Sequence, residues 1–200
     1  MQKIILASGS PRRKELLGLI GISYEVHKSD ADETVTATEP EEIVKELSAR
    51  KAWDVVEKIR RGKLEVSPEF ASGTVLGADT IVWKDGRLLG KPADRADAAR
   101  MLRFLQGEEH QVYTGVTLIG LDRETEDADS FAVRTNVFVH AMNEAEIEAY
   151  LDTGDAFDKA GSYGIQGPFA AFVDRIEGDY QNVVGLPVCA VYHRLMQRKN

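Results

Sequence analysis

Hydrophobic residues recur along this chain with two periods that alternate from one end to the other. Short apolar runs and strict alternation, as in Ile22, Tyr24 and Val26, indicate strands. Apolar residues three and four apart, as between 39 and 61, indicate amphipathic helices. The pattern predicts strands over 3–8, 22–26, 74–83, 111–121, 129–140 and 169–176, and helices over 11–20, 39–61, 94–105, 143–154 and from Pro187 onward.

The order of these elements predicts an α/β fold with long antiparallel strands in the middle and helices outside. Charged and glycine-containing segments predict turns at 84–87 and 122–127. The polar segment 62–73 is predicted to be a loop or an insertion. No repeat, low-complexity tract or obvious linker divides the chain.

A turn rich in small and basic residues follows the first predicted strand, Ser8-Gly9-Ser10-Pro11-Arg12-Arg13. Ser10 suits the N-cap of the next helix, and Pro11 suits its first position. Free N–H groups at a helix N-terminus bind anions, and guanidinium groups bind phosphate in two-point contacts. The turn therefore fits a phosphate site about as well as a capped helix with a solvated basic first turn. It has neither the Walker nor the dinucleotide-binding glycine pattern.

Acidic residues occur where the pattern changes from one element to the next. The segment Asp30-Ala31-Asp32-Glu33 follows the second predicted strand, and Asp79 interrupts an otherwise apolar strand. A charge within such a strand is costly unless it is paired, hydrogen-bonded or metal-bound. Asp79 could therefore accept a proton from water or bind a metal, or it could lie at a bulge with its carboxylate in water. The acidic segment fits a solvated loop or a source of ligands for Mg²⁺ or Mn²⁺.

Later polar residues are less specific when each is considered alone. Lys91 precedes a proline that stiffens its loop, but exposed lysines are common. His110 is a single histidine, which more often satisfies a turn than catalyses a reaction. The glycine-rich segment 152–167 is long for a loop without a function, and its Lys159 and Gln166 could bind a phosphate and a base edge.

The composition is that of an ordinary globular protein, and the net charge of −8 argues against a general nucleic-acid or membrane-surface binder. The single cysteine, Cys189, excludes an internal disulfide and stands in an apolar segment that predicts core packing. There is no apolar leader or run of transmembrane length. We therefore expect a cytoplasmic protein that binds neither nucleic acid nor membrane.

Taken in order, eight motifs resemble the Maf family of nucleoside triphosphate pyrophosphatases over essentially the whole chain. The first and the block from Asp158 to Gly167 are the most specific. The motifs are the turn at 8–13, Asp32-Glu33, Lys51 in Ala49-Arg50-Lys51-Ala52, Gly77-Ala78-Asp79-Thr80, Gly90-Lys91-Pro92, His110 to Val116, Asp155 to Gly167 and Gly178 to Pro187.

The resemblance implies a single domain over 1–200, with a mixed α/β fold, a long curved sheet, flanking helices and two lobes around a nucleotide cleft. It also implies hydrolysis of a nucleoside triphosphate to the monophosphate and pyrophosphate, with a divalent cation (Mg²⁺ or Mn²⁺), usually in a homodimer. The stretch between Lys51 and Asp79 looks longer than is usual in the family, and we expect that insertion to lie away from the cleft.

The family pattern also assigns roles. The proton acceptor of the family falls on Asp79, and three positions associated with substrate choice fall on Arg12, Thr80 and Gln166, in a combination similar to the branch acting on dTTP and UTP. Our hypothesis for the remaining groups is that Glu33 and Asp79 hold or lie near the metal. The phosphate-binding set would be Ser8, Ser10, Arg12, Arg13, Lys51, Lys91 and Lys159.

Two other functions remain open at this stage. The chain could be a nucleotide-binding regulator, for example of septum formation or cell division, that does not turn its ligand over. It could also be a different phosphohydrolase, such as one that removes the γ-phosphate. A pure sensor needs the basic cradle but no acidic base, so Asp79 together with Glu33 favours an enzyme.

Overall fold

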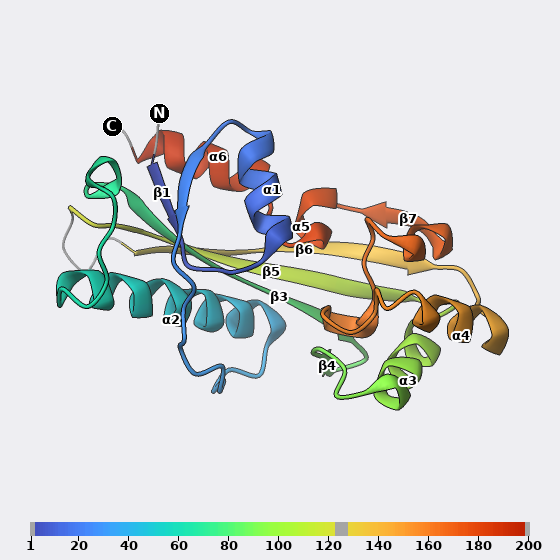
Figure 1. Cartoon of the computed structure of the whole chain (residues 1–200). Helices are drawn as coiled ribbons and strands as arrows, with labels where there is room; N and C mark the ends of the chain where they lie inside the picture. Colours follow the sequence, from blue (N-terminus) through green and yellow to red (C-terminus); the bar gives the residue numbers. More distant parts are fainter. Residues whose placement is uncertain (1–2, 123–127, 199–200) are drawn as a thin grey trace. The chain divides into compact units, whose positions relative to one another are not determined.

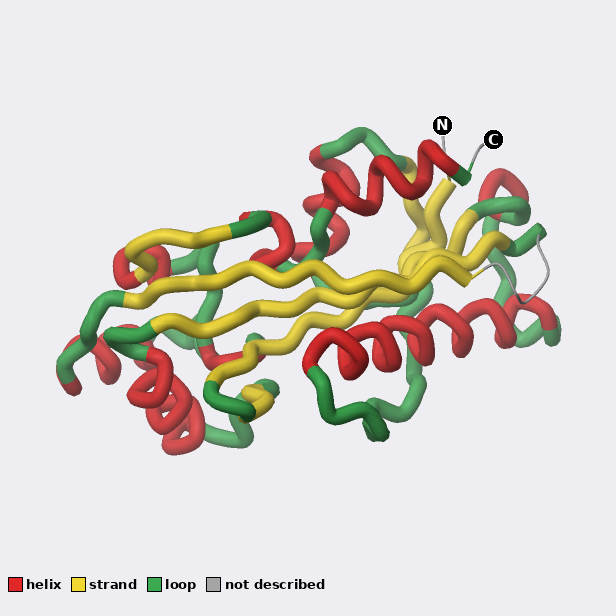
Figure 2. Tube along the Cα trace, turned by 180° about the vertical axis from the view of Figure 1, so that it is seen from behind, coloured by secondary structure: helices red, strands yellow, loops and turns green. Residues whose placement is uncertain are grey.

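The computed structural model describes residues 3–122 and 128–198, and these form a mixed α/β fold. The described strands make one seven-stranded sheet in the order β2-β1-β3-β5-β6-β7, with β4 paired to β3 (Figure 1). The long strands β3, β5 and β6 run side by side (Figure 2). The bounds are β1 (Lys3–Leu6), β2 (Ser23–Val26), β3 (Thr74–Lys84), β4 (Arg87–Leu89), β5 (Glu109–Gly120), β6 (Ala128–Val139) and β7 (Val173–Glu177).

The described chain divides into two compact units whose boundaries fall inside β3, β5 and β6. The first unit comprises Met1–Asp79, Thr114–Val133 and Gly185–Asn200, and the second comprises Thr80–Tyr113 and Arg134–Val184. The helices are α1 (Pro11–Leu19), α2 (Pro40–Arg60), α3 (Arg95–Leu105), α4 (Glu144–Asp152), α5 (Tyr180–Val184) and α6 (Val188–Gln197), with short 3-10 helices η1 (Pro68–Phe70), η2 (Ala160–Ser162) and η3 (Pro168–Phe172).

Parallel strand pairing organises the first unit. β1 pairs in parallel with β2 on one side and with β3 on the other, and Leu6 lies opposite Leu76 in the β1–β3 register. Parallel strands need covering on both faces, and after Lys3 the residues of β1 are accordingly apolar and fully buried, Ile4, Ile5 and Leu6. The carboxyl ends of β1 and of this part of β3 therefore lie at the same edge of the sheet.

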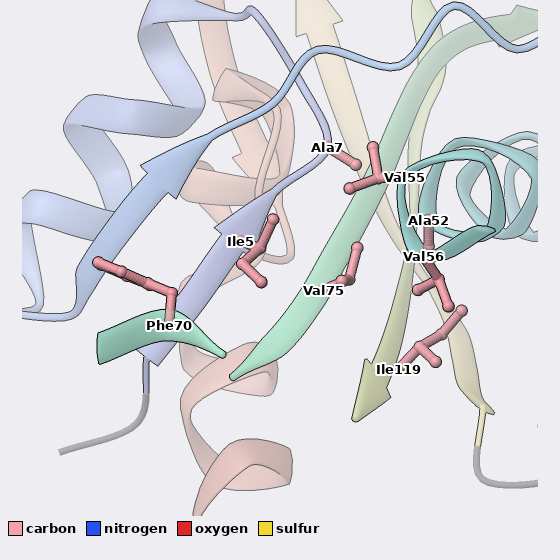
Figure 3. Close-up of a cluster of buried hydrophobic side chains, with 8 residues drawn as sticks. All are labelled: Ile5, Ala7, Ala52, Val55, Val56, Phe70, Val75 and Ile119. Carbon is pink, nitrogen blue, oxygen red and sulfur yellow. The ribbon is translucent and has the colours of Figure 1, made fainter. Parts of the chain in front are cut away.

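A compact hydrophobic cluster fixes α2 against the sheet in the first unit. Ala52, Val55 and Val56 of α2 pack with β1, β3, β5 and η1 (Figure 3). Full burial of a valine side chain contributes about 1.5–3 kcal/mol, so Val55 and Val56 hold the helix on the sheet. The other members of the cluster are Ile5, Ala7, Phe70, Val75 and Ile119.

Local capping signals define the helices of the second unit. Asn143 forms a capping box with Glu146 at the start of α4, and the Asp94 side chain accepts the Asp97 N–H at the start of α3. α3 and α4 pack together. The rings of Tyr150 and Tyr163 both pack on the fully buried Phe169, which ties α4 to the segment that follows it.

Most predicted elements are present, with boundaries shifted by a residue or two. The strand predicted over 169–176 is wrong in its first half, because Pro168 starts η3 and the strand β7 begins only at Val173. A short apolar run does not distinguish a strand from a helical turn. The predicted loop 62–73 contains η1, and α5 was not predicted. The predicted turn at 122–127 lies, apart from Asp122, outside the described residues.

The prediction that Cys189 packs in the core is wrong, because its side chain is exposed. The buried face of α6 consists of Val188, Val191 and Leu195, which recur with the helical period. Cys189 follows Val188 by one residue, which rotates it about 100° away from that face.

Candidate active site

The predicted phosphate turn connects β1 to α1 as expected, and its side chains are already organised. The Arg13 guanidinium donates from Nη1 to Ser8 Oγ at 3.0 Å and from Nε to the Gly185 carbonyl at 2.9 Å. Ser8 is buried, and its Oγ also lies 3.3 Å from the Ser10 N–H. Ser10 occupies the N-cap position, but its hydroxyl does not cap the helix. Arg13 is thus held in one orientation and is not a solvated surface side chain.

A lysine and two carboxylates meet beside this turn. Lys51 Nζ lies 2.5 Å from Asp79 Oδ1 and 2.8 Å from Glu33 Oε1. The side chains of Lys51 and Asp79 are only 16% and 13% exposed, whereas Glu33 is 70% exposed. Asp79 lies within β3 with its carboxylate largely out of water, and its charge is paired with that of Lys51. We call these three residues the Lys51 cluster.

Close packing of α2 on β3 brings Lys51 to Asp79. Gly77 lies under α2, where an added Cβ would be 2.8 Å from Ala52 N and closer still to Ser48 O. Only glycine allows the two backbones to approach so closely. Lys51 precedes Ala52 on the helix, and Asp79 is two residues beyond Gly77, on the same face of the strand. Nothing in the sequence indicated this pairing, because its partners are 28 residues apart.

The turn and the Lys51 cluster interact electrostatically. Burial lowers the pKa of the Arg13 guanidinium from its ordinary value, Asp79 opposes that shift, Arg12 adds to it and Glu33 opposes it. The parallel β1–β3 pairing explains why Asp79 lies near the turn that carries Arg13. The Ala7 N–H donates to the Leu76 carbonyl, so the turn after β1 begins beside the part of β3 that leads to Asp79. Ser8, Arg12, Arg13, Asp79 and Glu33 therefore share one electrostatic environment.

The candidate residues of the second unit are Thr80, Lys91, Lys159 and Gln166. Thr80 follows Asp79 in β3 and is half-buried, while Lys91 and Gln166 are exposed. Lys159 donates to the Asp155 and Asp158 carboxylates at 2.9 and 2.7 Å and to the Asp155 carbonyl. Two carboxylates and a carbonyl of its own loop therefore hold the Lys159 ammonium group in this structure. We call Lys159, Asp155 and Asp158 the Lys159 cluster.

Asp155 organises the glycine-rich loop in a way that sequence reasoning missed. Its Oδ2 accepts the Tyr150 hydroxyl at 2.9 Å. Burial raises the pKa of the Tyr150 phenol above its ordinary value, and the bond to Asp155 adds to that rise. Gly167 packs directly on Asp155, so a Cβ there would collide with its carboxylate, and a Cβ at Gly164 would collide with the Lys159 stem that Asp155 holds. The density of glycine and acid between 152 and 167 was the only signal available.

His110 is a structural residue in the described chain. It is fully buried, its Nε2 lies 2.7 Å from the Tyr163 hydroxyl, and the two rings meet edge to face. Burial lowers the pKa of His110 from 6.5 to about 3, and the nearby Lys84 charge contributes. His110 is therefore neutral at physiological pH, which agrees with the structural interpretation of the sequence.

The donor atoms of the Lys51 cluster suit a hard divalent cation. Asp79 and Glu33 direct one oxygen each at a single ammonium group, and carboxylate oxygens are the ligands that Mg²⁺ and Mn²⁺ prefer. Within residues 3–122 and 128–198, no three His, Cys, Asp or Glu side chains are grouped to hold a metal alone. Mg²⁺ commonly uses one or two carboxylates together with waters and substrate phosphates, so two protein ligands are sufficient.

Comparison with known proteins agrees with the resemblance. The Maf family model, described as Maf-like protein, matches residues 3–198. A dTTP/UTP pyrophosphatase of Agathobacter rectalis is 45% identical over 202 residues, which cover 98% of this chain and 97% of that protein. A dTTP/UTP pyrophosphatase of Bacillus anthracis is 46% identical over 198 residues, covering 98% of this chain and 96% of that protein.

Similarity to solved structures is weaker. The Ham1 protein of Staphylococcus aureus is 14% identical with a TM-score of 0.43, and the match covers 69% of this chain and 72% of that one. A match at this level adds nothing about the reaction. Among the described residues, no helix has both the length and the apolar character needed to cross a bilayer.

Proposed function

The chain belongs to the Maf-like protein family, and from this premise we propose that it hydrolyses dTTP and UTP to the monophosphate and pyrophosphate. The observation that carries the proposal is the half-buried pair of Asp79 and Lys51, electrostatically coupled to Arg13. A carboxylate that can accept a proton, next to cations that can bind phosphate, is what this hydrolysis requires. The names of the full-length relatives support the choice of substrates.

We assign phosphate binding to the turn and to the lysines. The N-terminus of α1 presents N–H groups and the positive end of the helix dipole, and Ser8, Ser10, Arg12 and Arg13 surround it. Arg13 is pre-oriented by Ser8 and Gly185, so less side-chain entropy is lost when a phosphate binds. In this proposal Lys51, Lys91 and Lys159 add positive charge.

We assign the role of general base to Asp79. Its carboxylate would orient a water molecule and accept its proton as the oxygen attacks the α-phosphorus, with pyrophosphate as the leaving group. Its position within the rigid strand β3 keeps the carboxylate in a fixed direction. Glu33 and Asp79 would hold the divalent cation, which when bound neutralises developing charge and acidifies water.

Selectivity is assigned to Arg12, Thr80 and Gln166. The Gln166 amide has both a donor and an acceptor, which can pair with the edge of a uracil or thymine ring. A site that hydrogen-bonds a substrate group rejects analogues lacking that group by about 10⁴-fold or more. Asp155 supports this assignment indirectly, because it shapes the loop that carries Gln166. A homodimer located in the cytoplasm remains the prediction from the resemblance and from the cysteine content.

Product analysis tests the proposal. The protein is incubated with dTTP, UTP, dCTP and dATP in turn, with Mg²⁺ or Mn²⁺, and the products are separated by anion exchange. We expect the monophosphate and pyrophosphate from dTTP and UTP, and much slower reaction with dCTP and dATP. Release of inorganic phosphate would instead identify a γ-phosphatase. Binding without any product would identify a nucleotide-binding regulator, for example of septum formation or cell division.

A further inference from the structure

Lys51 is held by the same oxygen atoms that the divalent cation would use. Its Nζ lies 2.5 Å from Asp79 Oδ1 and 2.8 Å from Glu33 Oε1, and its side chain is largely buried. An ammonium group and a hard metal ion both seek carboxylate oxygens. Both cations cannot occupy the space between these oxygens at once.

The position of Lys51 also offers its ammonium group a second partner. It stands in α2 and contacts Asp79 and Glu33, whose charges also act on Arg13 of the candidate phosphate turn. A lysine has a flexible four-carbon stem and a compact charge, so its ammonium can move without movement of the helix backbone. Released from Asp79, the ammonium would be available to a substrate phosphate.

We propose that Lys51 is a removable counter-ion, which pairs with Asp79 and Glu33 in the cation-free protein and leaves Asp79 when a divalent cation binds there. This inference rests on the proposed function, because it uses the same cation site. It assigns Lys51 two successive partners: the carboxylates before the cation binds, and the substrate phosphates afterwards. The arrangement keeps Asp79 from being a half-buried carboxylate without a partner, which would be costly.

Metal binding without nucleotide tests the inference. Mn²⁺ affinity is measured by isothermal titration for the unaltered protein and for Lys51→Met. We expect Lys51→Met to bind Mn²⁺ about tenfold more tightly or better, because the ion no longer displaces a charge-assisted hydrogen bond. Equal or weaker binding by Lys51→Met would overturn the inference.

Lys58 provides a matched control on the same helix. It is also paired with two carboxylates, Asp54 at 2.9 Å and Asp30 at 3.1 Å, and the assigned cation ligands are Glu33 and Asp79 instead. We expect Lys58→Met to leave Mn²⁺ affinity unchanged. A gain in Lys58→Met equal to that in Lys51→Met would show a general effect of net charge and would contradict the inference.

A second measurement uses the unaltered chain, so it does not depend on the folding of a variant. Lysines are acylated briefly with and without Mg²⁺, and the modified peptides are quantified by mass spectrometry. Lys51 should react several-fold faster with Mg²⁺, because its amine is no longer held between two carboxylates, while Lys58 should not change. Unchanged or slower labelling of Lys51 would overturn the inference.

Failure of the inference and failure of the proposed function are distinguishable. If the protein releases pyrophosphate from dTTP but Mg²⁺ does not change the labelling of Lys51, the proposed function stands. The proposal that Lys51 is a removable counter-ion is then refuted. A protein whose Mn²⁺ binding survives Asp79→Asn and Glu33→Gln together refutes the assigned cation site, and the inference with it.

Discussion

Lys51 and Lys159 are each held by two carboxylates, and the two clusters differ in how far apart their members lie in the chain. In the Lys159 cluster, the partners of Lys159 are four residues and one residue away, within a single loop. In the Lys51 cluster, the helix residue Lys51 meets Asp79 on a strand 28 residues further on. The first arrangement needs only a local turn, whereas the second needs the packed fold.

The difference indicates that the Lys159 cluster stabilises a loop, whereas the Lys51 cluster brings charges together for the proposed chemistry. The Lys159 cluster closes a short loop at little entropic cost and shapes the backbone that presents Gln166. The Lys51 cluster closes no local turn, because its members lie on separate elements. It also stabilises the fold little, since the cost of desolvating the two charges offsets much of the ion-pair energy. Charges brought together from distant elements and kept half-buried are typical of sites where chemistry occurs.

The largest expected effect is on turnover, from Asp79→Asn. The variant keeps the shape of the side chain but removes the general base, which typically costs about 10²–10⁴-fold in rate. Nucleotide binding should be largely retained, because the cations around the turn remain. Turnover is measured by pyrophosphate release, and binding by titration with dTTP in the absence of added metal.

Asp129 is the matched control for Asp79. It is also a strand aspartate paired with a basic side chain, in this case Arg194 at 2.7 Å, but it is not a candidate site residue. Asp129→Asn should retain normal turnover. Near-normal turnover in Asp79→Asn would remove that residue from the mechanism and leave the two lysine clusters equivalent.

The next largest effect is on stability, from Asp155→Ala. The substitution leaves the Tyr150 hydroxyl and Lys159 without their shared acceptor, which should lower the free energy of unfolding by about 1–3 kcal/mol. Urea denaturation measures it, with Asp152→Ala as the exposed control, expected to change stability by less than about 1 kcal/mol. If Asp155→Ala is as stable as the unaltered protein, the Lys159 cluster is not a folding device.

Gly77→Ala tests how the Lys51 cluster is assembled. The new Cβ would meet backbone atoms of Ser48 and Ala52, and overpacking of this kind costs about 1–3 kcal/mol. Because α2 must shift, turnover should fall as well. Gly18→Ala, whose Cβ would have nothing within 4 Å, should be neutral or gain about 0.5–1 kcal/mol. Unaltered turnover in a destabilised Gly77→Ala protein would show that helix placement does not control the cluster.

A further expected effect is a dependence of stability on pH in the second unit, where the segment 152–167 carries Tyr163 against His110. The pKa of His110 is about 3 in the fold and 6.5 when unfolded, so between these values the unfolded chain binds a proton that the folded chain does not. Stability from this group is complete above pH 6.5 and falls by about 1.4 kcal/mol for each pH unit between pH 6.5 and about 3.

Urea denaturation at pH 7 and pH 5 measures this slope. His110→Gln should have a shallower slope than the unaltered protein, and the exposed His193→Gln should not. An identical slope in His110→Gln would show that other groups dominate the acid response.

Sequence patterns predicted the elements that rest on local chemistry. The helix from Pro40 to Arg60 follows from its periodicity, and the start of α4 follows from its capping box. The turn between β1 and α1 follows from its small residues and from the proline at the first helical position. The errors have local causes too: η3 and the strand 169–176 share an ambiguous apolar run, and Cys189 lies one helical step from the buried face. The candidate residues were named from motifs, yet their partners were not.

By itself, the amino-acid sequence determined the α/β class, the family and the residue types available for chemistry, because periodicity and motifs are properties of neighbouring residues. Only the tertiary structure decided that Lys51 lies between Asp79 and Glu33, that Arg13 is held by Ser8 and Gly185, and that Lys159 is bound within its own loop. The physical reason is that an ion pair depends on distance in space, and the close packing of α2 on Gly77 sets that distance without leaving a local signal.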